Sequence, residues 1–272
     1  MKFSRQTTLR SQATVTGVGV HSGLPVSLTL GPASIDAGFI FVRSGPDGSD
    51  REVQAVAESV ISTEFATVLG DHRGPLVSTA EHVLAALRGM GIDNATIEVD
   101  GPEVPIMDGS SAPFVAAIDH AGILTQSAPR RFIQILKRVQ VVLGDAFGEL
   151  RPHAHGFRAE VEIDFANPVI GKQSFTLDLT PESFRRDICR ARTFGCMNDV
   201  ARLWGAGFAL GAYRSVRGGH KLNHAVLTAL MADRSAWRVV ESEPAQRPRG
   251  RVEIRSGMAG GMVAPAYGPD VS

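Results

Sequence analysis

The first half of the chain is arranged around the stretch STAEHVLAAL, residues 78–87. Its apolar residues begin a stripe that has the 3.6-residue period of an amphipathic helix. The stripe consists of Val83, Leu84, Leu87 and Met90. Gly89 and Gly91 then end the pattern. The sequence therefore predicts a helix that buries one face and has Glu81 beside His82 in its first turn.

Glu81 and His82 allow two interpretations. Ser78 and Glu81 have the spacing of a capping box, in which Glu81 would serve only the backbone. Neighbouring helix residues diverge by about 100°, so Glu81 and His82 do not pair with each other. At a helix start, however, both can lean toward one external point, with the imidazole on a metal and the carboxylate on a metal-bound water. The local sequence leaves both open, and the cap is the commoner use of the pattern.

Short β-rich runs surround this helix. Alternating apolar and polar residues bounded by glycine and proline mark strands. These runs occupy residues 13–20, 26–30, 38–43, 52–56, 63–69 and 95–99. Ser110 or Ser111 can cap a second helix, which has Pro113 near its first turn and ends at Gly122. Together these elements predict one α+β unit over residues 1–127.

A second unit follows the polar connector at residues 125–129, and we assign it residues 128–240. Strands are predicted at 132–143, 147–151, 157–163 and 173–178, and Thr180 with Pro181 predicts a helix start. Residues 199–204 have a helical pattern, as do residues 220–231. The unit is shortened near residues 205–217. Residues 241–272 are dense in glycine, proline and arginine, which predicts a flexible tail.

The composition excludes several classes of protein. Lysine plus arginine and aspartate plus glutamate number 28 each among 272 residues, so no overall charge favours nucleic acid as a partner. Residues 1–6 lack an apolar signal core, and no stretch approaches the roughly 18 apolar residues of a membrane span. We therefore expect a cytoplasmic protein without a transmembrane segment. Cys189 and Cys196 are the only cysteines, which excludes a disulfide framework and favours buried thiols.

Two further pairs of residues are candidates for chemistry. His220 and His224 are four residues apart, a spacing that puts both imidazoles on one helix face and suits a metal. A partly exposed pair without a ligand is the commoner outcome. Thr193 and Phe194 combine a hydroxyl that can stabilise an oxyanion with an aromatic that can stack on a sugar. Packing of both side chains in the core remains an equal alternative.

Taken together, several segments closely resemble the zinc-dependent UDP-3-O-acyl-N-acetylglucosamine deacetylases, which act in lipid A biosynthesis in Gram-negative bacteria. The matching segments are TGVGVHSG (16–23), STAEHVLAAL (78–87), GIDN (91–94), PEVPIMDGSSAPF (102–114), RARTFG (190–195) and GHKLN (219–223). The resemblance extends from about residue 5 to residue 240.

The resemblance implies a lipid-metabolism hydrolase with two similar α/β-sandwich domains and an active site between them. By position, Glu81 matches the family's general base and His82 its first zinc ligand. Thr193 matches the hydroxyl that supports the oxyanion, and Phe194 matches the aromatic beside the sugar. His220 matches the histidine that acts as general acid or electrostatic stabiliser. The implied cofactor is zinc, and the implied substrate is a UDP-linked acylated glucosamine that releases acetate.

One family motif is absent from this chain. The other two zinc ligands of the family lie in a His-Lys-x-x-Asp-x-x-Gly-Asp motif on a helix of the second domain, and this sequence contains no such motif. Residues 205–220 run directly from the region after RARTFG to GHKLN, which predicts an incomplete second domain. A catalytic zinc normally needs three protein ligands, so His82 alone is expected not to retain the metal. His220 and His224 are the available substitutes, in a site with His82.

Three functional hypotheses follow from these observations. The chain is an active zinc deacetylase, a family member that binds without catalysis, or an internal-deletion product that lacks the zinc-ligand helix.

Overall fold

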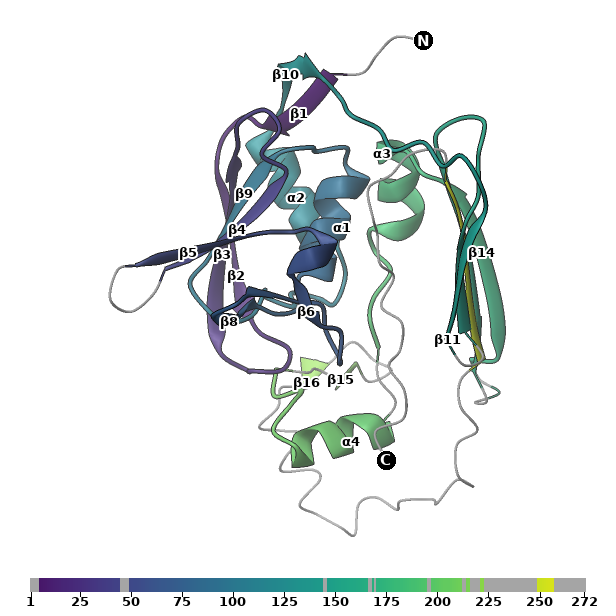
Figure 1. Cartoon of the computed structure of the whole chain (residues 1–272). Helices are drawn as coiled ribbons and strands as arrows, with labels where there is room; N and C mark the ends of the chain where they lie inside the picture. The colour runs from purple at the N-terminus through teal and green to yellow at the C-terminus, as the bar shows by residue number, and fades with distance from the viewer. Residues whose placement is uncertain are drawn as a thin grey trace.

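The computed structural model describes residues 5–44, 49–143, 146–165, 168, 170–194, 197–211, 214–215, 221–222 and 249–256. The first half contains a five-stranded sheet with two helices against it, and a second sheet stands apart from it (Figure 1). The expected mixture of α and β elements is confirmed. None of the described helices is long and apolar enough to cross a membrane.

The five-stranded sheet has the order β2-β3-β9-β4-β5. Its strands are β2 (Ala13–Val18), β3 (Pro25–Pro32), β9 (Ala95–Val99), β4 (Phe39–Ser44) and β5 (Asp50–Gln54). Only β4 and β9 pair in parallel. Helices α1 (Glu81–Gly89) and α2 (Ala112–Ala121) lie against one face (Figure 1). The core between them includes Leu28, Phe41, Leu87, Ile97 and Phe114.

Smaller elements complete the first half. Strands β6 (Val60–Ser62), β7 (Val68–Asp71) and β8 (Gly74–Val77) form an antiparallel sheet after the 3-10 helix η1 (Ala57–Ser59). Strand β1 (Arg5–Leu9) pairs with β10 (Ile123–Pro129). The polar segment interpreted as a connector thus forms a strand, because a partner more than 100 residues earlier supplies its hydrogen bonds.

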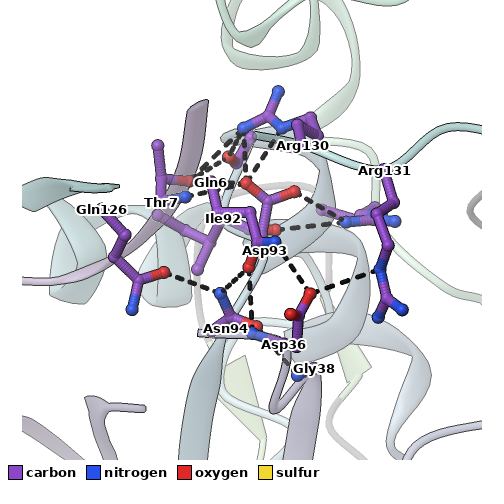
Figure 2. Close-up of polar contacts among 12 residues, drawn as sticks. Gln6, Thr7, Asp36, Gly38, Ile92, Asp93, Asn94, Gln126, Arg130 and Arg131 are labelled. Atoms are coloured by element: carbon purple, nitrogen blue, oxygen red, sulfur yellow. Dashed lines mark hydrogen bonds and ion pairs between the residues drawn. The ribbon is translucent and has the colours of Figure 1, made fainter. Parts of the chain in front are cut away.

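Asp93 joins this strand pair to the end of α1 (Figure 2). Its carboxylate accepts hydrogen bonds from the Thr7 backbone N–H (2.8 Å) and from Arg130 Nε (2.9 Å). Arg130 also donates to the carbonyl of Gly91 at 2.7 Å. An amide network continues the contact through Gln6, Asp36, Asn94 and Gln126. The GIDN segment therefore has a structural role, which is to fix the chain where it leaves the first half.

The second half is mostly strands. Strand β11 (Val139–Leu143) pairs with β12 (Ala146–Leu150), and a separate sheet has the order β14-β13-β17. The three strands of that sheet are β13 (Phe157–Asp164), β14 (Lys172–Asp178) and β17 (Arg249–Ser256). Strand β17 lies within the stretch predicted to be a flexible tail, where pairing with β13 fixes it. The predicted strand at 132–143 is shorter than expected and begins only at Val139.

Residues after β14 return to the first half. Thr180 and Ser183 form the capping box of α3 (Pro181–Ser183), which confirms the predicted helix start. The following π-helical turn η2 (Phe184–Ile188) buries Phe184 completely in the first-half core. A side chain on Gly89 would collide with the Phe184 ring, so the close approach of α1 to this turn requires glycine.

The remaining elements are short. Helix α4 (Met197–Gly205) confirms the helical pattern predicted there. Strands β15 (Arg214–Ser215) and β16 (Lys221–Leu222) pair with each other. The helix predicted at 220–231 is therefore wrong at Lys221 and Leu222, and the rest of it lies outside the described residues. Cys189 is buried as predicted, and the side chain of Cys196 is among those not described.

Candidate functional site

Helix α1 begins without the predicted capping box. Ala80 is the N-cap residue, and no side chain caps the helix. The Ser78 backbone instead forms a β-bridge with Glu103 and exchanges hydrogen bonds with Pro102 and Val104, both at 3.0 Å. This long-range pairing holds Ser78 outside the helix, so Glu81 is its first residue rather than its third. The capping interpretation of Glu81 is wrong.

The carboxylate of Glu81 contacts a neighbouring loop instead. Its Oε2 accepts a hydrogen bond from the backbone N–H of Thr67 at 3.0 Å. Glu81 is partly exposed, at the end of α1 that faces the residues before β7. A carboxylate fixed through one oxygen at a helix start can accept a proton at the other.

His82 is held next to Glu81 from the side of α2. Its backbone carbonyl accepts a hydrogen bond from Ser111 Oγ at 3.0 Å. Burial lowers the pKa of His82 below its ordinary value, and the charges of Glu81 and Asp108 oppose this effect. A lowered pKa favours the neutral imidazole near pH 7, which is the form that binds metals.

Asp108 faces the same region and was not singled out from the sequence. Its Oδ1 accepts hydrogen bonds from the Ser110 hydroxyl (2.7 Å) and backbone N–H (3.1 Å). Its Oδ2 accepts one from Arg192 at 3.3 Å. Burial acts to raise the pKa of Asp108, but the bonds from Ser110 and Arg192 outweigh it and lower the pKa. Asp108 is therefore ionised across the neutral range.

The segment after η2 brings Thr193 to this region. The Thr193 backbone N–H donates to the carbonyl of Gly109 at 2.9 Å, next to the Asp108–Arg192 pair. Thr193 is exposed, and Phe194 is 51% exposed with its ring 6.0 Å from that of Phe165. The alternative in which both side chains pack in the core is wrong.

A second group of rings lies beside the turn that contains His21. The His21 ring is 5.9 Å from Phe208 and 6.4 Å from Phe65, and those two rings are 5.8 Å apart. The segment after α4 reaches this turn through a hydrogen bond from Gly211 N–H to the carbonyl of Val20 (2.9 Å). Phe65 precedes Thr67 by two residues, so these rings lie near the Glu81 side of α1.

The structure thus brings Glu81, His82, Asp108 and the Arg192–Thr193 segment into one neighbourhood. His220 and His224 lie outside the described residues. Among the described residues, no group of three or more histidine, cysteine, aspartate or glutamate side chains could hold a metal ion. Asp108 belongs to the segment PEVPIMDGSSAPF, and that membership was the only signal in the sequence that pointed to it.

Comparison with known proteins gives one consistent result. A family model described as UDP-3-O-acyl N-acetylglycosamine deacetylase matches residues 6–214. Proteins named UDP-3-O-acyl-N-acetylglucosamine deacetylase from Brucella ovis and Brucella canis are each 40% identical to this chain over 285 residues. The match covers 87% of this chain and 99% of each relative. A protein of the same name from Brucella melitensis matches with the same identity and coverage.

Proposed function

The chain belongs to the UDP-3-O-acyl-N-acetylglucosamine deacetylase family. We propose that it catalyses the reaction for which its relatives are named. That reaction is hydrolysis of the acetamide of a UDP-linked acylated glucosamine, with release of acetate, as a step of lipid A biosynthesis. The observation that carries the proposal is the 40% identity over 87% of the chain. The family model's match over residues 6–214 includes the segment in which Glu81 and His82 open α1.

We assign roles to the residues of the site on the same basis. Glu81 is the general base, because its carboxylate is partly exposed and is fixed by Thr67. Thr193 supplies a hydroxyl to the oxyanion, and Phe194 presents an exposed ring to the sugar. His220 is the proposed general acid or electrostatic stabiliser. The exposure of Thr193 and Phe194 next to the Asp108–Arg192 pair supports their assignment.

The metal that the family uses does not fit the described residues. His82 presents a neutral imidazole, which suits a zinc ligand. Both oxygens of Asp108 accept hydrogen bonds, from Ser110 and Arg192, and Glu81 binds Thr67 through Oε2, which leaves its other oxygen for the role of general base. One imidazole does not make the three-ligand set of a catalytic zinc. The described residues therefore support no step of the reaction through a metal.

The second candidate is that this chain is a catalytically inactive family member or a deletion product. The motif His-Lys-x-x-Asp-x-x-Gly-Asp is missing from the sequence. The match to the relatives extends over 285 residues, whereas 87% of this 272-residue chain is about 237 residues. About 48 positions of the match therefore have no residue in this chain, which supports an internal deletion.

Zinc content and acetate release together distinguish the two candidates. The purified chain, loaded with zinc and dialysed, is assayed with the UDP-linked acylated substrate. The first candidate predicts stoichiometric zinc and release of acetate, and Glu81→Gln as matched control abolishes the release without loss of zinc. Zinc far below one equivalent with no release excludes it. Calorimetric titration with the same substrate then separates a binding protein from a deletion product that does not bind.

A further inference from the structure

Glu103 is a buried carboxylate to which the resemblance and the proposed function give no role. It is 1% exposed and lies between β9 and α2 in sequence. Its Oε1 accepts hydrogen bonds from the Thr79 hydroxyl (2.8 Å) and the His21 backbone N–H (3.0 Å). Its Oε2 accepts one from the Ser22 backbone N–H at 2.9 Å. These donors are neutral, so the carboxylate is stabilised by hydrogen bonds that converge from two separate loops.

The first of these loops is the three-residue link between β8 and α1. Thr79 is 2% exposed and has a φ of 60°, in the left-handed region that a β-branched residue rarely adopts. Its neighbours are held in place, because Ser78 pairs with the Pro102–Val104 segment and the Ala80 backbone N–H donates to the carbonyl of Thr67. A strained conformation of this kind persists only where the surroundings over-determine it. The bond from Thr79 to Glu103 supplies that constraint.

The second loop is the turn that contains His21. A Cβ on Gly19 would collide with the Glu103 carboxylate and with Ser22 Oγ, so the turn wraps directly around the carboxylate. The His21 ring then contacts Phe65 and Phe208. One carboxylate thus sets both the start of α1 and the turn on which these rings rest.

We propose that Glu103 is a positioning residue of this site: through Thr79 it fixes the backbone turn that orients Glu81 and His82 at the start of α1. The functional meaning of this role rests on the proposed function, in which Glu81 and His82 act on the substrate. The positioning itself is a property of the described residues. Glu81 has a reporter that does not touch Glu103, namely the Thr67 backbone N–H, which donates to the Glu81 carboxylate.

The test follows the Thr67 amide by NMR and hydrogen exchange in the full chain. Glu103→Gln replaces one acceptor oxygen by a donor that faces N–H and O–H donors, and Thr79→Val removes the hydroxyl with little change of shape. In both variants we expect the Thr67 amide signal to shift and its exchange to become about tenfold faster. Thr79→Ser keeps the hydroxyl and is expected to keep the signal of the unmodified chain.

A matched control separates positioning from general destabilisation. Asp93→Asn weakens the same domain at the opposite end of α1 and is expected to leave the Thr67 signal in place. If Thr79→Val, or a folded Glu103→Gln, leaves the Thr67 amide unchanged, the proposal is overturned. It is equally overturned if Asp93→Asn moves that amide as much. The readout needs no turnover, so a chain that releases no acetate contradicts the proposed function and leaves this test intact. Where acetate is released, Glu103→Gln is expected to lower kcat with little change of KM.

Discussion

At the scale of single residues, the backbone of Ser78 decides which partner the carboxylate of Glu81 has. The spacing of Ser78 and Glu81 is that of a capping box. The β-bridge between Ser78 and Glu103 separates the two residues, and Glu81 accepts its hydrogen bond from Thr67. In a capping box the Glu81 carboxylate would bond the backbone at the start of its own helix. It bonds the loop that contains Thr67 instead.

Replacement of Ser78 by alanine tests whether its hydroxyl caps α1. Because its hydroxyl caps no backbone N–H of α1, Ser78→Ala is expected to change the free energy of unfolding by less than about 0.5 kcal/mol. Loss of a true N-cap costs typically about 1 kcal/mol or more. Thermal or urea unfolding of the two chains gives the comparison, with Thr180→Ala as the control that removes a genuine cap. Equal losses in both variants would restore the capping role.

At the scale of elements, the turn η2 is docked on α1 through Phe184 and Gly89. Gly→Ala inside a helix usually stabilises it by roughly 0.5–1 kcal/mol. Gly89→Ala is expected to do the opposite and to cost roughly 1–3 kcal/mol, because the new methyl overlaps the Phe184 ring. In a Phe184→Ala background the same change is expected to be neutral or stabilising. Urea unfolding of the unmodified chain, the two single variants and the double variant gives the coupling free energy between Gly89 and Phe184. If Gly89→Ala still destabilises the chain that lacks the Phe184 ring, this packing is contradicted.

Two ion pairs fasten the segment that contains η2 and Thr193, and acid weakens them. The hydrogen bond from Arg185 lowers the pKa of Asp119, against the opposing effect of burial, and the pKa of Asp108 is also lowered. A carboxyl group with a lowered folded-state pKa stabilises the protein above its unfolded pKa of about 4, and this contribution is lost as the pH falls through the folded value.

Replacement of Asp119 tests this linkage. Asp119→Asn is expected to lower Tm at pH 6 and to flatten the fall of Tm below pH about 4. Calorimetric scans of both chains between these conditions provide the measurement. Parallel curves for the two proteins would show that the Arg185–Asp119 pair does not hold the segment.

At the scale of the whole molecule, the second half exposes an apolar strand. Val141 and Val142 of β11 are 69% and 65% exposed, on opposite faces of the strand. Exposed apolar strands and edges promote association. We expect the chain to self-associate in light scattering, and Val141→Lys and Val142→Lys to reduce this. Thr14→Lys, on an exposed position of β2, is the control that adds the same charge elsewhere. Equal scattering from all variants would locate the association outside β11.

The sequence predicted those elements whose signals are local. Helix α4 and the Thr180–Ser183 box depend on residues close together in the chain, and both form as expected. The start of α1, the strand β10 and the burial of Phe184 depend on partners 24 to more than 100 residues away, which a periodic pattern does not encode. The site follows the same division. Glu81 and His82 are predicted as site residues from one short segment. Asp108 and Glu103 are recognised only from their contacts with Arg192 and Thr79, which are distant in the sequence.

Because β17 lies late in the sequence, the sheet β14-β13-β17 is completed only near the end of synthesis of the described residues. This strand pairs with β13 along eight residues and lies beside β12, yet it is the last described element in the sequence. At roughly 5–20 residues per second, a ribosome finishes Arg249 on the order of 10 s after Pro129. During that interval the first half has all of its strands, whereas the second has only two-stranded pieces, which are marginal alone. Nascent chains therefore carry a first half with all of its strands and a second half without β17, and every truncation before Arg249 leaves β13 paired only with β14.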